Sequence, residues 1–202
     1  MLDKIMKKQN KTNLNSDKSQ NIAIRNEYAS IGVKAFYESK GANYENPHFE
    51  QIEALLIKNL EKFDWSNVLD LSCGSGEVSL ILKKFSISTI ATDPYTKLAF
   101  EKNLNSTFFE YTFDDIIKGA LDGFHFTTVI CSFALHLCPE DKLFPLLTKI
   151  LKKNTILGII TPHKRPDLRI LSFIEHLFDD FSLTEKGKKV YLNAYKLNYY
   201  TE

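Results

Sequence analysis

The chain has few cysteines, almost no net charge and no long apolar run. Three cysteines among 202 residues make an odd number without zinc-ribbon spacing, which favours a reduced intracellular chain over a disulfide framework. The net charge of +1, from 26 basic and 25 acidic residues, argues against a globally basic nucleic-acid binder. No apolar stretch approaches the roughly 20 residues that cross a bilayer. We therefore expect a cytoplasmic protein without membrane association.

The sequence favours one α/β domain preceded by a polar tail. Residues 1–20 are rich in Lys and Asn and lack the apolar segment of a secretory signal, so we expect a disordered tail there. The composition, 44% hydrophobic and 12% aromatic, fits one domain with a full core. No internal repeat or linker divides residues 21–202, which we assign to a single domain.

Strand and helix patterns alternate along this domain. Near-continuous apolar runs such as 128–131 predict strands covered on both faces, as in a parallel sheet. Two final strands separated only by a short Lys- and Gly-containing turn predict an antiparallel hairpin. The result is a doubly wound sheet of seven strands. Helices are predicted near 21–40, 48–63, 77–85, 95–103, 114–120, 140–152 and 167–178, and strands near 67–72, 88–92, 107–112, 127–132, 155–161, 181–186 and 189–198.

The most informative segment is residues 68–77, where an apolar strand ends in Asp70 and a small-residue loop follows. Glycines in such a loop let the backbone approach a nucleotide-bearing ligand closely. Asp93 ends the next strand 23 residues later, near the spacing that places a carboxylate on a bound ribose. A nicotinamide dinucleotide is disfavoured, because Asp70 stands where a pyrophosphate needs backbone donors and positive potential. An acid there suits a cationic ligand instead.

The string Asp70-x-Ser-Cys-Gly-Ser-Gly resembles motif I of class I S-adenosylmethionine-dependent methyltransferases. The resemblance extends over most of residues 22–198 and implies a Rossmann-like class I fold with a C-terminal antiparallel hairpin. It implies S-adenosylmethionine as cofactor, with Asp93 on the ribose hydroxyls. It also implies a helical lid over 21–64 and a Rossmann-like core over 65–202. Segments 28–48 and 161–166 look like a small, mostly uncharacterised subgroup, whereas Phe126-Thr127 departs from the usual aromatic-Asp start of the fourth strand.

The resemblance also supplies the remaining candidate cofactor residues. The segment from Thr112 to Ile116 would edge the adenine ring, although Thr112 and Asp115 also fit an ordinary helix cap. The end of the fourth strand would line the transferable methyl group, and two tyrosines would belong to the lid. The cofactor set is Asp70, Ser72, Cys73, Gly74, Ser75, Gly76, Asp93, Pro94, Thr112, Phe113, Asp115, Cys131, Tyr37 and Tyr44, and no metal ligands are predicted.

The expected reaction is in-line displacement, in which an acceptor atom attacks the methyl carbon of the sulfonium. Alignment and water exclusion are then the main tasks of the protein. Where the acceptor must lose a proton, His136 is the first candidate base and His163 the second. His163 and Lys164-Arg165, between two prolines after the fifth strand, fit either a solvated turn or a basic rim that engages an anionic substrate. We expect a small-molecule acceptor, with RNA or protein as alternatives, and a monomer or weak homodimer. The rival function is a non-catalytic cofactor-binding subunit of a partner enzyme.

Overall fold

The computed structural model describes Ala35 and residues 46–198. Residues 46–198 lie in the larger of the two compact units of the chain, Ala42–Glu202. The predicted tail, Tyr37 and Tyr44 fall outside the described residues, and of the helix predicted near 21–40 only Ala35 is described, in a helical conformation. Of the proposed lid over 21–64, the structure therefore describes Ala35 and residues 46–64.

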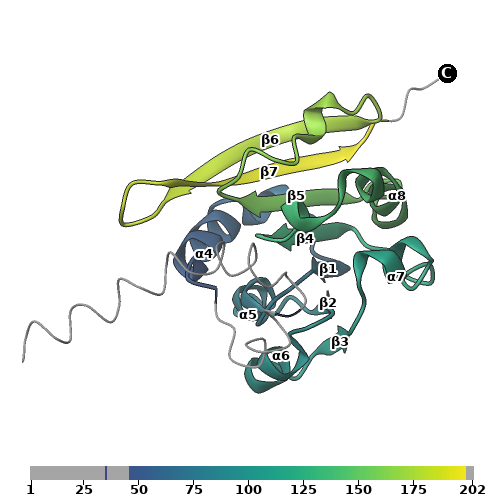
Figure 1. The fold of residues 1–202 in the computed structure, drawn as a ribbon. Coiled ribbons are helices and arrows are strands. Elements are labelled where there is room, and N and C mark those ends of the chain that lie inside the picture. The colour runs from purple at the N-terminus through teal and green to yellow at the C-terminus, as the bar shows by residue number, and fades with distance from the viewer. Residues whose placement is uncertain (1–34, 36–45, 199–202) are drawn as a thin grey trace, which may run out of the picture. The chain divides into compact units, whose positions relative to one another are not determined.

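Strands and helices alternate through the described part of the chain, as predicted, up to the fifth strand (Figure 1). The strands are β1 (Val68–Leu71), β2 (Thr89–Thr92), β3 (Thr107–Phe109), β4 (Thr128–Ser132), β5 (Ile156–Thr161), β6 (Ile174–Leu183) and β7 (Lys189–Leu197). The α-helices are α4 (Phe49–Lys58), α5 (Glu77–Lys83), α6 (Lys97–Asn103), α7 (Phe113–Ile117) and α8 (Glu140–Ile150). Short 3-10 turns are η3 (Leu60–Lys62), η4 (Leu135–Leu137) and η5 (Leu168–Ile170).

The seven strands form one sheet in the order β3-β2-β1-β4-β5-β7-β6. Strands β1 to β5 are parallel, whereas β7 is antiparallel to both β5 and β6. The order reverses at β1, so β1 and β4 flank the topological switch point where open α/β sheets bind ligands. This arrangement confirms the predicted doubly wound sheet with a terminal hairpin.

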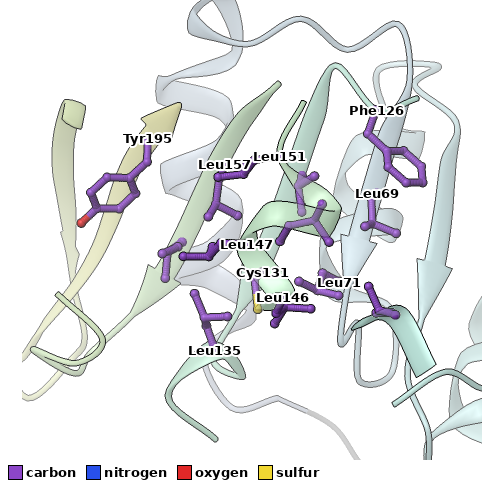
Figure 2. Packing of buried hydrophobic residues seen from close by; sticks show 14 of the residues in the cluster. Leu69, Leu71, Phe126, Cys131, Leu135, Leu146, Leu147, Leu151, Leu157 and Tyr195 are labelled. Carbon is purple, nitrogen blue, oxygen red and sulfur yellow. The ribbon is translucent and has the colours of Figure 1, made fainter. Parts of the chain in front are cut away.

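Helices cover both faces of the sheet because the side chains of each strand alternate between them. Leu69 and Leu71 of β1 belong to the cluster that holds Leu146 and Leu147 of α8. Figure 2 shows these four side chains together with Cys131 and Leu157 from the next two strands. Val68 belongs instead to the cluster on the opposite face, which α4 and α5 supply with Ile52, Leu55, Leu56, Val78, Ile81 and Leu82. Asp70 follows Val68 by two residues on β1, so its side chain points to the same face of the sheet, the face that α5 covers.

One predicted element is wrong. The helix predicted over 167–178 is replaced by η5 and by the first half of β6, which pairs with β7. The reason is a register shift between His176 and Phe178, which interrupts the two-residue alternation that identifies a strand. His176, within the range of that predicted helix, therefore lies on β6, where its ring contacts Tyr195 at 5.3 Å between centroids.

Within residues 46–198, no helix combines the length and the apolar character that crossing a membrane would require.

Candidate functional site

The loop after β1 is held in a conformation that glycine favours. Ser72, Gly74 and Gly76 have φ values of 55°, 58° and 90°, in the left-handed region. At Gly76, the N-cap of α5, an added Cβ would lie 2.8 Å from the ring of Phe100 on α6. Gly76 is thus needed both for its backbone angle and for the close packing of α6. The backbone of the loop lies at the carboxyl end of β1, as the sequence predicts.

Asp70 is fully buried beneath this loop. Its Oδ2 accepts hydrogen bonds from the backbone N–H and the hydroxyl of Ser79, at 3.1 and 2.7 Å. Its Oδ1 is buried and accepts no hydrogen bond from any described residue. Burial raises the pKa of Asp70 to about 7, against the opposing effect of the hydrogen bonds from Ser79. A buried carboxylate with one unsatisfied oxygen is suited to a cationic partner.

Asp93 connects the ends of β1 and β2. Its Oδ1 accepts from the backbone N–H groups of Tyr95 and Thr96 at 2.9 and 3.1 Å, and its Oδ2 accepts from that of Gly74 at 3.2 Å. Burial raises the pKa of Asp93. Of these three backbone donors only Gly74 reaches Oδ2, so this oxygen carries fewer backbone hydrogen bonds than Oδ1. Pro94, half-buried, lies in the turn that Asp93 holds.

Glu77 is a site residue that the sequence analysis did not single out. The side chain is buried, and its Oε1 accepts from the backbone N–H of Asn46 at 3.0 Å and from the hydroxyl of Ser75. Burial raises the pKa of Glu77 above its ordinary value. In the sequence Glu77 looks like any acid in the first turn of a helix, and its long-range contact with Asn46 leaves no local signal. Glu77 thus links the glycine loop to the segment before α4.

The segment after β3 forms the helix cap that its sequence predicts. The hydroxyl of Thr112 accepts from the backbone N–H of Asp115 at 3.1 Å, while Asp115 Oδ2 accepts from the backbone N–H of Thr112 at 2.9 Å. These two bonds form a capping box at the start of α7. The hydrogen bonds from Thr112 lower the pKa of Asp115. Phe113 is partly buried against the core, so an adenine contact from this segment stays a prediction.

The cysteines are buried and unsuited to nucleophilic chemistry. Cys73 and Cys131 are 2% and 0% exposed, and burial raises the pKa of both thiols well above the ordinary value. Cys73 is therefore a small residue that fills space in the loop, and its predicted contact with the cofactor stays a prediction. Cys131 lies in the core on β4, within the cluster shown in Figure 2.

The two candidate bases come together although 27 positions separate them in the sequence. His136 lies on η4 after β4, and His163 lies just after β5. The centroids of their rings are 4.3 Å apart, with a tilt of 47° between the ring planes. The backbone N–H of His163 donates to the hydroxyl of Thr161 at 3.0 Å, which fixes the turn. Both imidazoles are half-buried.

A second aromatic pair lies at the end of β4. The ring of His48, at the N-cap of α4, stacks on Phe133 with 4.9 Å between centroids and 9° between ring planes. Phe133 has a φ of 58°, and its backbone N–H donates to the carbonyl of Ile160. Burial lowers the pKa of His48. Neither residue was predicted as part of a site, because the contact between them arises only in the fold.

The parallel pairing of β1, β2, β4 and β5 brings the carboxyl ends of these strands to one edge of the sheet, together with the candidate site residues at those ends. Asp70 pairs in register with Ala91 of β2 and with Ile130 of β4, and Ile130 pairs with Gly158 of β5. The loops that follow the four strands therefore begin at the same level. Among residues 46–198, no three His, Cys, Asp or Glu side chains are placed to hold a metal ion.

Comparison with known proteins places this fold among methyltransferases. No protein-family profile matches the chain. An uncharacterised protein of Schizosaccharomyces pombe is 31% identical over 194 residues, which cover 73% of this chain and 77% of that protein. A methyltransferase from Anabaena variabilis, described as S-adenosylmethionine-dependent, superposes with a TM-score of 0.66 at 12% identity and covers 82% of this chain and 93% of its own. The N-methyltransferase NodS from Bradyrhizobium japonicum, in complex with S-adenosylhomocysteine, superposes with a TM-score of 0.57 at 12% identity over 82% of this chain and 97% of its own. At these identities the solved structures show the fold, which is the Rossmann-like class I methyltransferase fold.

Proposed function

We propose that this chain is an S-adenosylmethionine-dependent methyltransferase. It belongs to the same family as the Schizosaccharomyces pombe protein and has the fold of the class I methyltransferase superfamily. Its acceptor is a small organic molecule, because the described core has no large insertion that would form a separate substrate domain. Structural neighbours with S-adenosylmethionine, S-adenosylhomocysteine or sinefungin bound support the choice of cofactor.

The observation that carries the proposal is the buried acidic set around the glycine loop: Asp70, Glu77 and Asp93. A pyrophosphate would be repelled by these carboxylates, whereas a sulfonium or ammonium group would be attracted to them. The unsatisfied Oδ1 of Asp70 provides an acceptor for such a cation. Asp93 Oδ2, which accepts one backbone hydrogen bond, from Gly74, suits a ribose hydroxyl. These residues fit S-adenosylmethionine better than they fit a nicotinamide dinucleotide.

When bound, S-adenosylmethionine supplies a methyl group on a sulfonium, which is open to in-line attack by a nucleophilic atom of the acceptor. Asp70 and Asp93 hold the cofactor, while Gly74 and Gly76 let the backbone approach it. His136 or His163 takes the proton from an acceptor that must lose one. The His48–Phe133 stack, at the same sheet edge, excludes water from the reacting atoms.

Calorimetric titration with S-adenosylmethionine, S-adenosylhomocysteine and NADH tests the cofactor. We expect the two sulfur ligands to bind and NADH not to bind. Asp93→Asn should weaken both sulfur ligands while Asp122→Asn, at an exposed ion pair with Lys149, leaves their affinity unchanged. Circular dichroism of each variant controls for folding. Binding of NADH alone, or of no ligand to the folded chain, would refute the proposal.

Turnover separates an enzyme from a cofactor-binding subunit. A screen of small phenols, amines and carboxylic acids, read by release of S-adenosylhomocysteine, should yield at least one methylated product. Cofactor binding without turnover, restored to activity only by a partner protein, would favour the non-catalytic function.

A further inference from the structure

The carboxyl edge of the sheet is divided between acidic and basic residues. The loops after β1 and β2 carry Asp70 and Asp93, with Glu77 at the start of α5. Backbone N–H groups and hydroxyls donate the hydrogen bonds that these three carboxylates accept, and among the described residues no Lys or Arg donates to them. This half of the edge therefore keeps its negative potential whenever the carboxylates are ionised.

The loops after β4 and β5 carry the opposite character. We name this set the basic edge, and it consists of His136, His163, Lys164 and Arg165. The two imidazoles are in ring contact at 4.3 Å, which places η4 beside the segment that holds the two cations. Pro162 and Pro166 bracket this segment and fix the φ angle on each side of it.

The cations of the basic edge are only weakly neutralised. Lys164 and Arg165 are exposed. Arg165 faces one acid, Glu140, at 3.9 Å, with both side chains more than four-fifths exposed. An exposed ion pair of this length contributes little and exchanges readily for another anion. Arg165 can therefore bind a carboxylate or phosphate at the cost of only this weak ion pair.

We propose that the methyl acceptor is an anion, bound through its carboxylate or phosphate group by the basic edge. The inference rests on the proposed function and deepens it. The acidic half of the site attracts a cationic cofactor and repels an anionic acceptor, so opposite charges orient the two ligands along the sheet edge. Imidazole and guanidinium groups are also strong hydrogen-bond donors to carboxylate and phosphate oxygens.

The test uses the whole chain with its histidines labelled with ¹⁵N, so that each imidazole reports on its own surroundings. Benzoate, inorganic phosphate and the neutral isostere benzamide are titrated at constant ionic strength, with and without saturating S-adenosylhomocysteine. We expect benzoate and phosphate to shift the His136 and His163 signals saturably in both conditions. Benzamide should not shift them, and the exposed His125 serves as an internal reference.

The double variant Lys164→Ala/Arg165→Ala should weaken benzoate binding about 2- to 30-fold, the range that two exposed ion pairs provide. The matched control is Lys186→Ala/Lys188→Ala, in the turn between β6 and β7, which should leave the affinity for benzoate unchanged. Equal shifts with benzamide, equal losses in both double variants, or displacement of benzoate by S-adenosylhomocysteine would overturn the inference. Cofactor binding in the same samples separates this result from failure of the proposed function, which would show as no binding of S-adenosylhomocysteine.

Discussion

Asp70→Asn should make the protein more stable at pH 8 and at the same time weaken its cofactor site. Asp70 is 0% exposed, and its Oδ1 has no hydrogen-bond partner among the described residues. The folded state therefore holds the proton of Asp70 more tightly than the unfolded chain does. Because the pKa is raised, ionisation of Asp70 lowers the free energy of unfolding as the pH rises from about 4 to about 7. Below about pH 4 and above about pH 7, the contribution of Asp70 to the free energy of unfolding does not change with pH.

The magnitude follows from the shift of the pKa from 3.8 to about 7, which corresponds to about 4 kcal/mol at pH 8. Asparagine cannot ionise, so the variant avoids this cost. Its carbonyl oxygen can still accept from Ser79, but its amide then places an unsatisfied donor where Oδ1 lies, at a cost of about 1–3 kcal/mol. The net gain is about 1–3 kcal/mol at pH 8. Near pH 4, where Asp70 is protonated, the variant should be the less stable of the two.

Urea denaturation at pH 4, 5, 6, 7 and 8, fitted for the free energy of unfolding, measures the crossover. Asp180→Asn is a control of opposite sign, because the hydrogen bonds of Asp180 with Lys58 and Asn59 lower its pKa and the substitution should destabilise the fold at pH 8. Asp70→Asn should also weaken the binding of S-adenosylmethionine about 10- to 100-fold, because it removes the partner of the cationic group of this ligand. Destabilisation by Asp70→Asn at pH 8 would refute the reasoning, since it would mean that the carboxylate is already paired.

Three further predictions concern the rest of the site. Gly76→Ala should destabilise the fold by about 1–3 kcal/mol in urea, because φ is 90° and the new Cβ would press on Phe100; a cost near zero would contradict this. Thr112→Ala should cost about 1 kcal/mol by removing the capping box of α7, and Thr112→Ser should restore most of it; equal losses would point to the methyl group instead of the hydroxyl. With an acceptor from the screen that must lose a proton, His136→Ala, at the first candidate base, should lower turnover about 10²- to 10⁴-fold and leave S-adenosylhomocysteine affinity within about twofold; turnover like that of the unaltered chain would exclude His136 as the base.

Much of the fold is predictable because its signals are local. Buried parallel strands such as Thr128–Ser132 are continuous apolar runs, and the turn around Gly187 marks the hairpin. The first half of β6 escapes prediction because the bulge near Leu177 shifts the alternation by one residue. A strand with a bulge can thus carry the apolar spacing of a helix, and only its pairing with β7 decides between them.

The candidate site likewise contains residues that local sequence signals predict and residues that they do not. Asp70, Gly74 and Asp93 are predictable because strand ends and backbone angles follow from neighbouring residues. The capping role of Thr112 and Asp115 is also readable, since three residues separate them. Glu77 escaped notice because its partner Asn46 lies 31 positions away. The contact between His136 and His163 depends in the same way on the pairing of β4 with β5.

The place of β7 between β5 and β6 has a consequence for the order in which the protein can assemble on the ribosome. β6 is synthesised before β7 but pairs with no other strand, so it stays unpaired while the sheet still lacks β7. Only when residues 189–197 emerge can β7 insert and join β6 to β5. A nascent chain that stops short of residue 189 would thus leave the outer edge of β5 and both edges of β6 unpaired at once. Chaperones that shield such edges would be needed most before residues 189–197 leave the ribosome.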